Sequence, residues 1–168
     1  FRYSARYEIR AGPNTKASWA GSDSDPDTLG GRIAAALASA ADGERVAIAV
    51  PETSPIAENA FDGRVWVLVN RHTYSNAAVI AALMQDLGIA TVMGEETADL
   101  PTTYGAVERF SLPHSGAEII YPKAYMVRPS GSEEVRGVVP DFLIAPAPIG
   151  SSRDRMLETA VTQIGLTR

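Results

Sequence analysis

Residues 64–93 decide how the rest of this chain is interpreted. They read RVWVLVNRHTYSNAAVIAALMQDLGIATVM. Residues 64–69 form an apolar run of strand length, residues 75–87 an apolar stretch of helix length that stops at Gly88, and residues 89–93 a second apolar run. A strand, a helix and a strand in this order predict a right-handed crossover in a parallel sheet whose faces are both covered by helices.

Length and composition set the class of protein. The 168 residues suffice for one domain with a substantial core, and we expect a single domain over residues 1–168. The net charge of −5 and the scattered Lys and Arg argue against nucleic acid as a partner. The absence of cysteine excludes disulfides, zinc–thiolate sites and a cysteine nucleophile. Because the chain opens on Phe1 with no signal peptide, we expect a mature segment or a piece of a longer protein.

The remaining chain divides into short elements separated by polar connections. Helices are expected over residues 29–38, capped by Asp27 and Thr28, and over residues 152–164. Residues 11–27, 51–62 and 94–104 are expected to be irregular, because Gly, Pro and polar residues dominate them. Strands are expected at residues 1–10, 46–50, 106–112, 117–121, 124–127 and 142–145.

Ser75 stands where the central strand gives way to the helix, and two interpretations of it are open. Serine is a favoured helix N-cap, so an ordinary capping role is the simpler one. A nucleophile is the other, because open α/β sheets bind ligands beyond the carboxyl ends of their strands. The apolar helix that follows is expected to be buried and to hold the serine in place. The free N–H groups of the first helical turn, beginning with Asn76, would face an oxyanion formed by attack of Ser75 on a carbonyl.

Five motifs in chain order resemble landmarks of the catalytic core of the S41 serine peptidases, the family of the C-terminal processing (tail-specific) proteases and the tricorn core. The resemblance covers residues 61–146 and implies an α/β, ClpP/crotonase-like fold: a mostly parallel sheet with flanking helices and a small β-rich C-terminal part. Residues 1–60 would then be a variable insertion, and residues 147–168 a terminal helix. The motifs are Gly63–Asn70, Thr73–Ala77, Gly94–Thr97, Leu112–Gly116 and Gly137–Asp141.

By the same resemblance the protein is a serine endopeptidase of C-terminal processing type, which works through an acyl-enzyme on Ser75. The tail-specific branch deprotonates its serine with a lysine, but that position falls on Leu100 and the supporting glutamine falls on Tyr104. Leucine accepts no proton, so this mechanism does not transfer. The tricorn-like branch uses a histidine from earlier in the chain and a glutamate shortly before the Gly137–Asp141 motif, and Glu134 occupies the glutamate's place.

No general base is therefore identified in this chain. The two histidines and one lysine are the weaker candidates: His72 beside the nucleophile, His114 in a turn, and Lys123 near a proline. We expect the histidine and the Gly-rich loop of the oxyanion hole to lie upstream of Phe1, because Gly30 and Gly31 read as helix. The chain would then be the C-terminal part of a catalytic domain and inactive alone.

Partners and alternatives follow from the same pattern. We expect a peptide or protein substrate, no cofactor and no metal, since Glu95, Glu96 and Asp99 read as a solvated acidic loop. The resemblance also implies a location outside the cytoplasm and a PDZ domain upstream; no oligomeric state is predicted. A non-catalytic ligand- or peptide-binding module of the same fold is the alternative function, like the retinoid-binding repeats that resemble this family. A crotonase-type acyl-CoA enzyme is a third, disfavoured by the Gly137–Asp141 motif.

Overall fold

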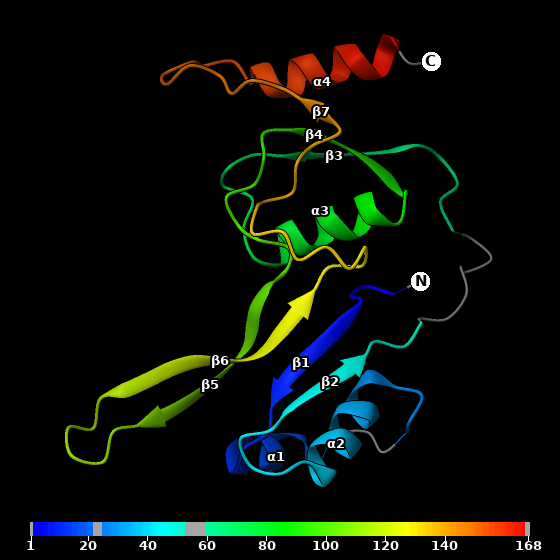
Figure 1. The fold of residues 1–168 in the computed structure, drawn as a ribbon. Coiled ribbons are helices and arrows are strands. Elements are labelled where there is room, and N and C mark those ends of the chain that lie inside the picture. The colour runs from blue at the N-terminus through cyan, green and yellow to red at the C-terminus, as the bar shows by residue number, and fades with distance from the viewer. Residues whose placement is uncertain (1, 22–24, 53–59, 167–168) are drawn as a thin grey trace. The chain divides into compact units, whose positions relative to one another are not determined.

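A computed structural model describes residues 2–21, 25–52 and 60–166. The chain divides into two compact units, each built from two chain segments (Figure 1). Unit one comprises residues 1–54 and 102–132, and unit two comprises residues 55–101 and 133–168. The assignment of residues 1–168 to a single domain stays a prediction.

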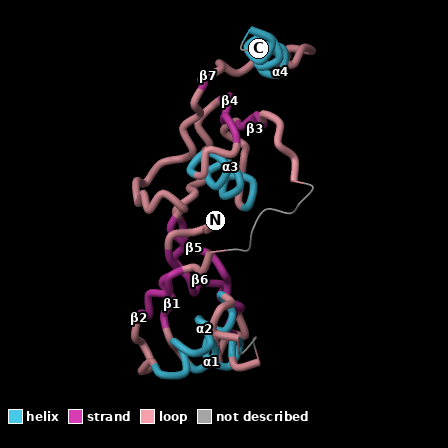
Figure 2. The backbone as a smooth tube through the Cα atoms, turned by 90° about the vertical axis from the view of Figure 1, so that its right-hand side faces the viewer, coloured by secondary structure: helices cyan, strands magenta, loops and turns pink. Residues whose placement is uncertain are grey.

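Unit one is an antiparallel sheet with two helices beside it (Figure 2). Its strand order is β2-β1-β6-β5, and β6 pairs with β1 on one side and with β5 on the other. Helix α2 is capped by Thr28, whose hydroxyl accepts the Gly31 N–H at 3.0 Å, as the sequence predicts. Its elements are β1 (Arg6–Arg10), α1 (Pro13–Trp19), α2 (Leu29–Ser39), β2 (Arg45–Ala49), β5 (Thr103–Ser111) and β6 (Glu118–Val127).

The core of unit one joins α2 to three strands. Ile33 and Leu37 of α2 are buried against Ile9 of β1, Ile48 of β2 and Ala124 of β6. The alternation of apolar and polar residues along these short strands places one face of the sheet against the helix.

Two expectations for this unit are wrong. Helix α1 occupies part of the segment expected to be a loop, with Pro13 in its first turn, where the missing N–H of proline costs nothing. Strand β6 is continuous where two strands were expected. Pro122 is tolerated in it because β1 pairs only with the part of β6 from Ala124 to Val127.

Unit two contains the predicted crossover. Strands β3 (Val65–Val69), β4 (Ala90–Gly94) and β7 (Phe142–Leu143) form a parallel sheet in the order β3-β4-β7. Helices α3 (Asn76–Asp86) and α4 (Arg155–Leu166) lie on its two sides (Figure 1). Neighbouring residues of β4 face opposite helices: Val92 is buried with Ala81 of α3, and Met93 with Ala160 of α4.

The expected mixed α/β fold with a parallel sheet and flanking helices is confirmed. The antiparallel share is larger than expected, because the β-rich segment from Thr103 to Val127 pairs with β1 and, through it, extends to β2. Helix α3 is buried on one face only: Ala78, Ala81 and Ala82 are inaccessible, whereas Ile80 is 51% exposed.

Candidate active site

The turn between β3 and α3 is held by three local hydrogen bonds. The Thr73 N–H donates to the Asn70 carbonyl at 2.9 Å, and the Asn70 N–H donates to the Thr73 hydroxyl oxygen at 3.0 Å. The His72 N–H donates to the Asn70 side-chain carbonyl at 2.8 Å. Side chains of this kind build tight turns by bonding to nearby backbone. The turn is thus a preformed support for the residues that follow it.

Ser75 itself has a strained backbone. Its φ is 56° and its ψ is −128°, a region that residues with a Cβ rarely occupy and that costs about 1–3 kcal/mol. Ser75 stands at the N-cap of α3, but its hydroxyl makes no capping hydrogen bond, and the residue is exposed. An ordinary serine cap has an extended backbone and bonds the helix with its side chain. Ser75 does neither, so the hydroxyl is not used by the helix.

Asp99 contacts the nucleophile candidate and was not singled out by its sequence context. Its carboxylate accepts hydrogen bonds from the backbone N–H of Ser75 and, at 3.0 Å, from that of Leu100. In a capping box the side chain three residues into the helix accepts the N-cap N–H. That position in α3 is Ala78, which has no acceptor, and Asp99 takes the role from a separate loop. Asp99 was expected to be a solvated loop carboxylate.

The loop that carries Asp99 is anchored by two of the sequence motifs. Thr97 is buried; its hydroxyl donates to the Asp99 carbonyl at 2.8 Å and accepts the Val138 N–H at 2.9 Å. The Thr97 N–H donates to the Val138 carbonyl at 3.2 Å. A Cβ on Gly137 would lie 1.7 Å from the Thr97 carbonyl oxygen, so only glycine lets the two segments approach this closely. The sequence motifs at residues 94–97 and 137–141 therefore contact each other directly in the fold.

Asp141, the last residue of the second motif, ties this contact to the sheet and to α3. Its carboxylate accepts the Val92 N–H of β4 at 2.7 Å and the Gln85 side-chain amide of α3 at 2.9 Å. The same Gln85 amide donates to the Val139 carbonyl at 2.9 Å. Helix α3 is thus held by a side chain near its C-terminal end as well as by packing.

Asn76 is the first residue of α3. No hydrogen-bond partner is found for its backbone N–H within the described part of the chain, whereas the Ala77 N–H donates to the Tyr74 carbonyl at 3.1 Å. The first N–H groups of a helix have no partner inside it and attract negative charge. The Asn76 amide therefore has the chemistry of an oxyanion donor.

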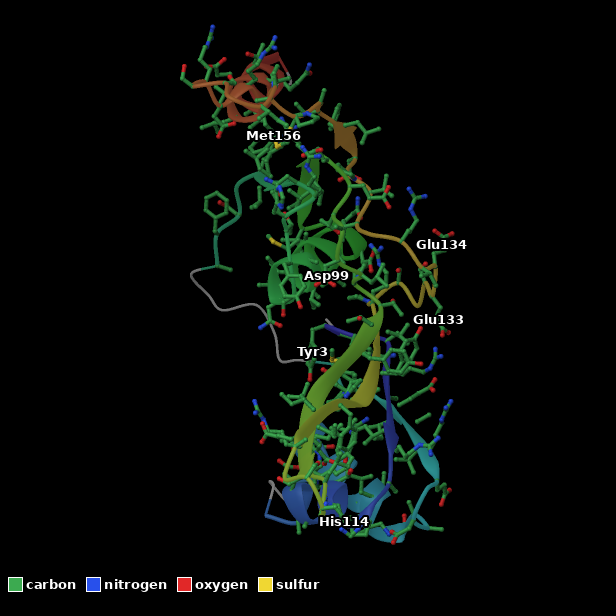
Figure 3. All side chains as sticks on the ribbon, turned by 90° about the vertical axis from the view of Figure 1, so that its left-hand side faces the viewer. Tyr3, Asp99, His114, Glu133, Glu134 and Met156 are labelled. Carbon is green, nitrogen blue, oxygen red and sulfur yellow. The ribbon has the colours of Figure 1, made fainter. Side chains whose placement is uncertain are left out.

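Glu134 lies in an exposed turn with Arg136. Arg136 makes a two-point ion pair with Glu96, at 2.9 and 3.2 Å. This hydrogen bond, with a smaller contribution from the Glu134 charge, raises the pKa of Arg136, and Arg136 in turn lowers the pKa of Glu96. Figure 3 shows Asp99 and Glu134 separated, and among the described residues no interaction joins Glu134 to Ser75.

The candidates for a general base are dispersed. His72 is exposed in the turn before Ser75, and His114 is exposed in the turn between β5 and β6 of unit one. Lys123 is ion-paired with Glu108 at 3.2 Å in unit one, with both side chains nearly buried. Leu100, at the family's lysine position, is partly buried.

Neither a metal site nor a membrane span is found among the described residues. No group of three or more metal-ligating side chains comes together in the described ranges. None of the helices described is both long and apolar enough to span a bilayer.

Comparison with known proteins identifies the family. The sheet and helices of unit two define an α/β protein of the crossover type, and residues 10–144 match Peptidase family S41. The chain belongs to this family. The match begins at residue 10, whereas the resemblance noted from the sequence motifs covers residues 61–146.

Several solved structures are similar to the chain. A CPAF mutant has a TM-score of 0.58 at 14% identity, over 85% of this chain and 33% of that one. Mature CPAF complexed with lactacystin has a TM-score of 0.50 at 16% identity, over 83% and 33%. The photosystem II D1 C-terminal processing protease is 26% identical over 49% of this chain and 21% of that one, with a TM-score of 0.41. No curated protein matches. The chain thus spans a third or less of these structures.

Proposed function

We propose that this chain carries the nucleophile of a serine peptidase, and that the nucleophile is Ser75. The observation that supports it best is the backbone of Ser75, strained at φ 56° while its exposed hydroxyl makes no capping bond. Strain of this size persists only where the surrounding structure imposes it, and it gathers at functional sites. A serine on a strained strand-to-helix turn is also how other hydrolases present a nucleophile.

The proposed reaction is acyl transfer through Ser75. Its Oγ attacks the carbonyl carbon of a peptide, and the Asn76 N–H stabilises the oxyanion. The Oγ–C bond forms, the C–N bond breaks, and the hydroxyl proton ends on the leaving amine. Water then hydrolyses the ester, which restores the hydroxyl and releases a carboxylic acid. The proposal assigns proton acceptance to no residue of this chain.

Asp99 enters the proposal as a positioning residue. By accepting the Ser75 N–H it takes the role that the third helical residue has in a capping box, and it fixes the backbone that presents the hydroxyl. Asp99→Ala removes this acceptor, whereas Asp99→Asn keeps a carbonyl oxygen there. We expect labelling of Ser75 by a fluorophosphonate to slow about tenfold or more in Asp99→Ala, the factor for one hydrogen bond to a charged group, and to recover mostly in Asp99→Asn.

Glu134 enters as a second carboxylate, on the strength of its place before the Gly137–Asp141 motif alone. Glu134→Gln should slow peptide hydrolysis without changing the free energy of unfolding. Its neighbour Glu133 is also exposed, and Glu133→Gln is the matched control. Equal rates in the two variants would remove Glu134 from the site.

The deciding experiment is reaction of the full-length protein, which we expect to supply the general base, with a fluorophosphonate, followed by peptide mass mapping. Only an activated hydroxyl reacts, so we expect one label, on Ser75, and none in Ser75→Ala. If the full-length protein is folded and binds peptides but stays unlabelled, the non-catalytic binding module is supported instead. The observation that favours that alternative is Leu100 at the lysine position.

The family also suggests the setting in which such an enzyme works. We propose a peptide or protein substrate and a location outside the cytoplasm, with a PDZ domain in the same protein. We also propose that the fold is the ClpP/crotonase-like one. Fractionation of cells that express the full-length protein tests the location directly.

A further inference from the structure

A cavity of about 350 Å³ borders the turn that precedes Ser75. It lies entirely in unit two, between the end of β3, the residues after β7 and the first turn of α4. Its apolar walls include Val69, Met156 and Leu157. Figure 3 shows Met156 on α4, above the strands of this unit. The volume falls at the lower end of the range of small-molecule pockets.

The cavity also has an anionic side. Glu95 and Asp154 line it, with Arg71 as the one lining residue that is always cationic. The Asp154 carboxylate accepts the Leu157 N–H at 3.0 Å, so it is partly occupied as the cap of α4. Of the two carboxylates, that of Glu95 accepts fewer hydrogen bonds from the described residues.

The Glu95 carboxylate lacks a close partner. Its side chain is only 19% exposed, and the nearest cation, Arg71, is 3.9 Å away and 57% exposed. No hydrogen bond to this carboxylate is found within the described residues. A charge removed from water needs a hydrogen-bonded partner, and a loose pair at the surface contributes little. A ligand with a cationic end would supply the missing donor.

The cavity is close to the proposed nucleophile. Thr73 lines it, and Thr73 and Ser75 are two positions apart, so their Cα atoms are separated by at most about 7 Å. An extended peptide advances about 3.3 Å per residue. A peptide whose carbonyl lies at Ser75 can therefore place a side chain of a residue near that bond in the cavity.

We propose that this cavity is a specificity pocket for a lysine side chain of the peptide substrate. The alkyl stem packs on Val69, Met156 and Leu157, and the ammonium pairs with Glu95. The proposal rests on the proposed function for its role in cleavage, but binding in the cavity needs no chemistry at Ser75. The three hydrogen bonds of the turn from Asn70 to Thr73 keep this wall in place before a ligand binds.

Binding is tested by NMR on the full chain carrying Ser75→Ala, with methyl-labelled methionine. The probe is Nα-acetyl-lysine methylamide, and the matched uncharged probe is Nα-acetyl-norleucine methylamide. We expect the lysine probe to shift the methyl signal of Met156 in a saturable way. The chain has four methionines, and Met126 of unit one serves as the internal control, because Met93 belongs to the same packed cluster as Met156.

Glu95→Gln should weaken binding of the lysine probe about tenfold or more, the factor for a charge-assisted hydrogen bond. Glu133→Gln, which removes an exposed charge of the same unit away from the cavity, should leave it unchanged. Equal affinity for the two probes, no effect of Glu95→Gln, or no saturable Met156 shift up to the solubility of the probe would each overturn the pocket. Because catalysis is removed in this background, these results are independent of fluorophosphonate labelling.

Discussion

The strained backbone of Ser75 predicts different effects of two small substitutions on the free energy of unfolding. If the residue is strained, Ser75→Gly relieves about 1–3 kcal/mol, since glycine adopts φ 56° freely. Glycine also loses about 0.4–1 kcal/mol more chain entropy on folding. The net expectation is a gain of about 1 kcal/mol over the unaltered chain. Ser75→Ala keeps the Cβ and loses no capping bond, so its stability should match the unaltered chain to within about 0.5 kcal/mol.

Urea unfolding measures these differences. Trp66 lies in β3 of unit two and Trp19 in α1 of unit one, so a Trp19→Phe background lets Trp66 report on unit two alone. With a slope of about 1–3 kcal/mol per molar urea, the midpoint of Ser75→Gly should rise by about 0.3–1 M. Both variants should also fail to react with the fluorophosphonate.

The sign of the change in Ser75→Gly separates the strained backbone from an ordinary helix cap. An ordinary cap predicts that Ser75→Ala loses about 1 kcal/mol and that Ser75→Gly loses a few tenths, both below the unaltered chain. A stability of Ser75→Gly at or below that of the unaltered chain would therefore contradict the strain. The sign relative to the unaltered chain, rather than the order of the two variants, is decisive.

Two further predictions concern the scaffold. Gly137→Ala forces its Cβ against the Thr97 carbonyl and weakens the two hydrogen bonds between Thr97 and Val138. We expect it to lower the free energy of unfolding of unit two by about 3 kcal/mol or more, measured in urea. The control is Gly165→Ala on α4, where the added Cβ meets no other atom, and it should not lower this free energy. In unit one, burial alone would raise the pKa of Glu108, but hydrogen bonds led by that from Tyr121 outweigh it and hold the pKa below the ordinary value. A depressed carboxyl pKa stabilises the fold above the unfolded value near 4.5, and that stability is lost as the pH falls through the folded pKa. Acid unfolding followed at Trp19 should show this loss, and Glu108→Gln should flatten it; an unchanged profile would contradict the assignment.

The crossover of unit two could be predicted from sequence almost to the residue. Strand β3 was expected at residues 64–69 and runs from Val65 to Val69. The prediction succeeds because a short, unbroken apolar run is typical of a buried strand. Helix α1 could not be predicted, since its seven residues include a proline, an asparagine and a serine and its cap, Gly12, makes no side-chain bond. It is stabilised by contacts distant in sequence, such as the Thr15 hydroxyl donating to Glu108 at 3.1 Å.

The site was predictable only in part, because contacts distant in sequence also determine its geometry. Ser75 stands out because a strand, a turn and a helix meet there within a few residues. Its backbone angles are set by tertiary contacts and leave no mark in composition. Asp99 lies 24 positions further along, in a loop whose carboxylates all look alike in sequence. Which of them contacts Ser75 depends on Thr97 and Gly137, whose spacing carries no periodic signal.

The interleaving of the two units has a consequence for biosynthesis. Strand β6 stands between β1 and β5, and Arg6 of β1 is opposite Val127 of β6. At about 5–20 residues per second, the ribosome needs several seconds to deliver β6 after β1 has been made. During that interval β1 exposes an unpaired edge in the nascent chain, where a chaperone would protect it from aggregation.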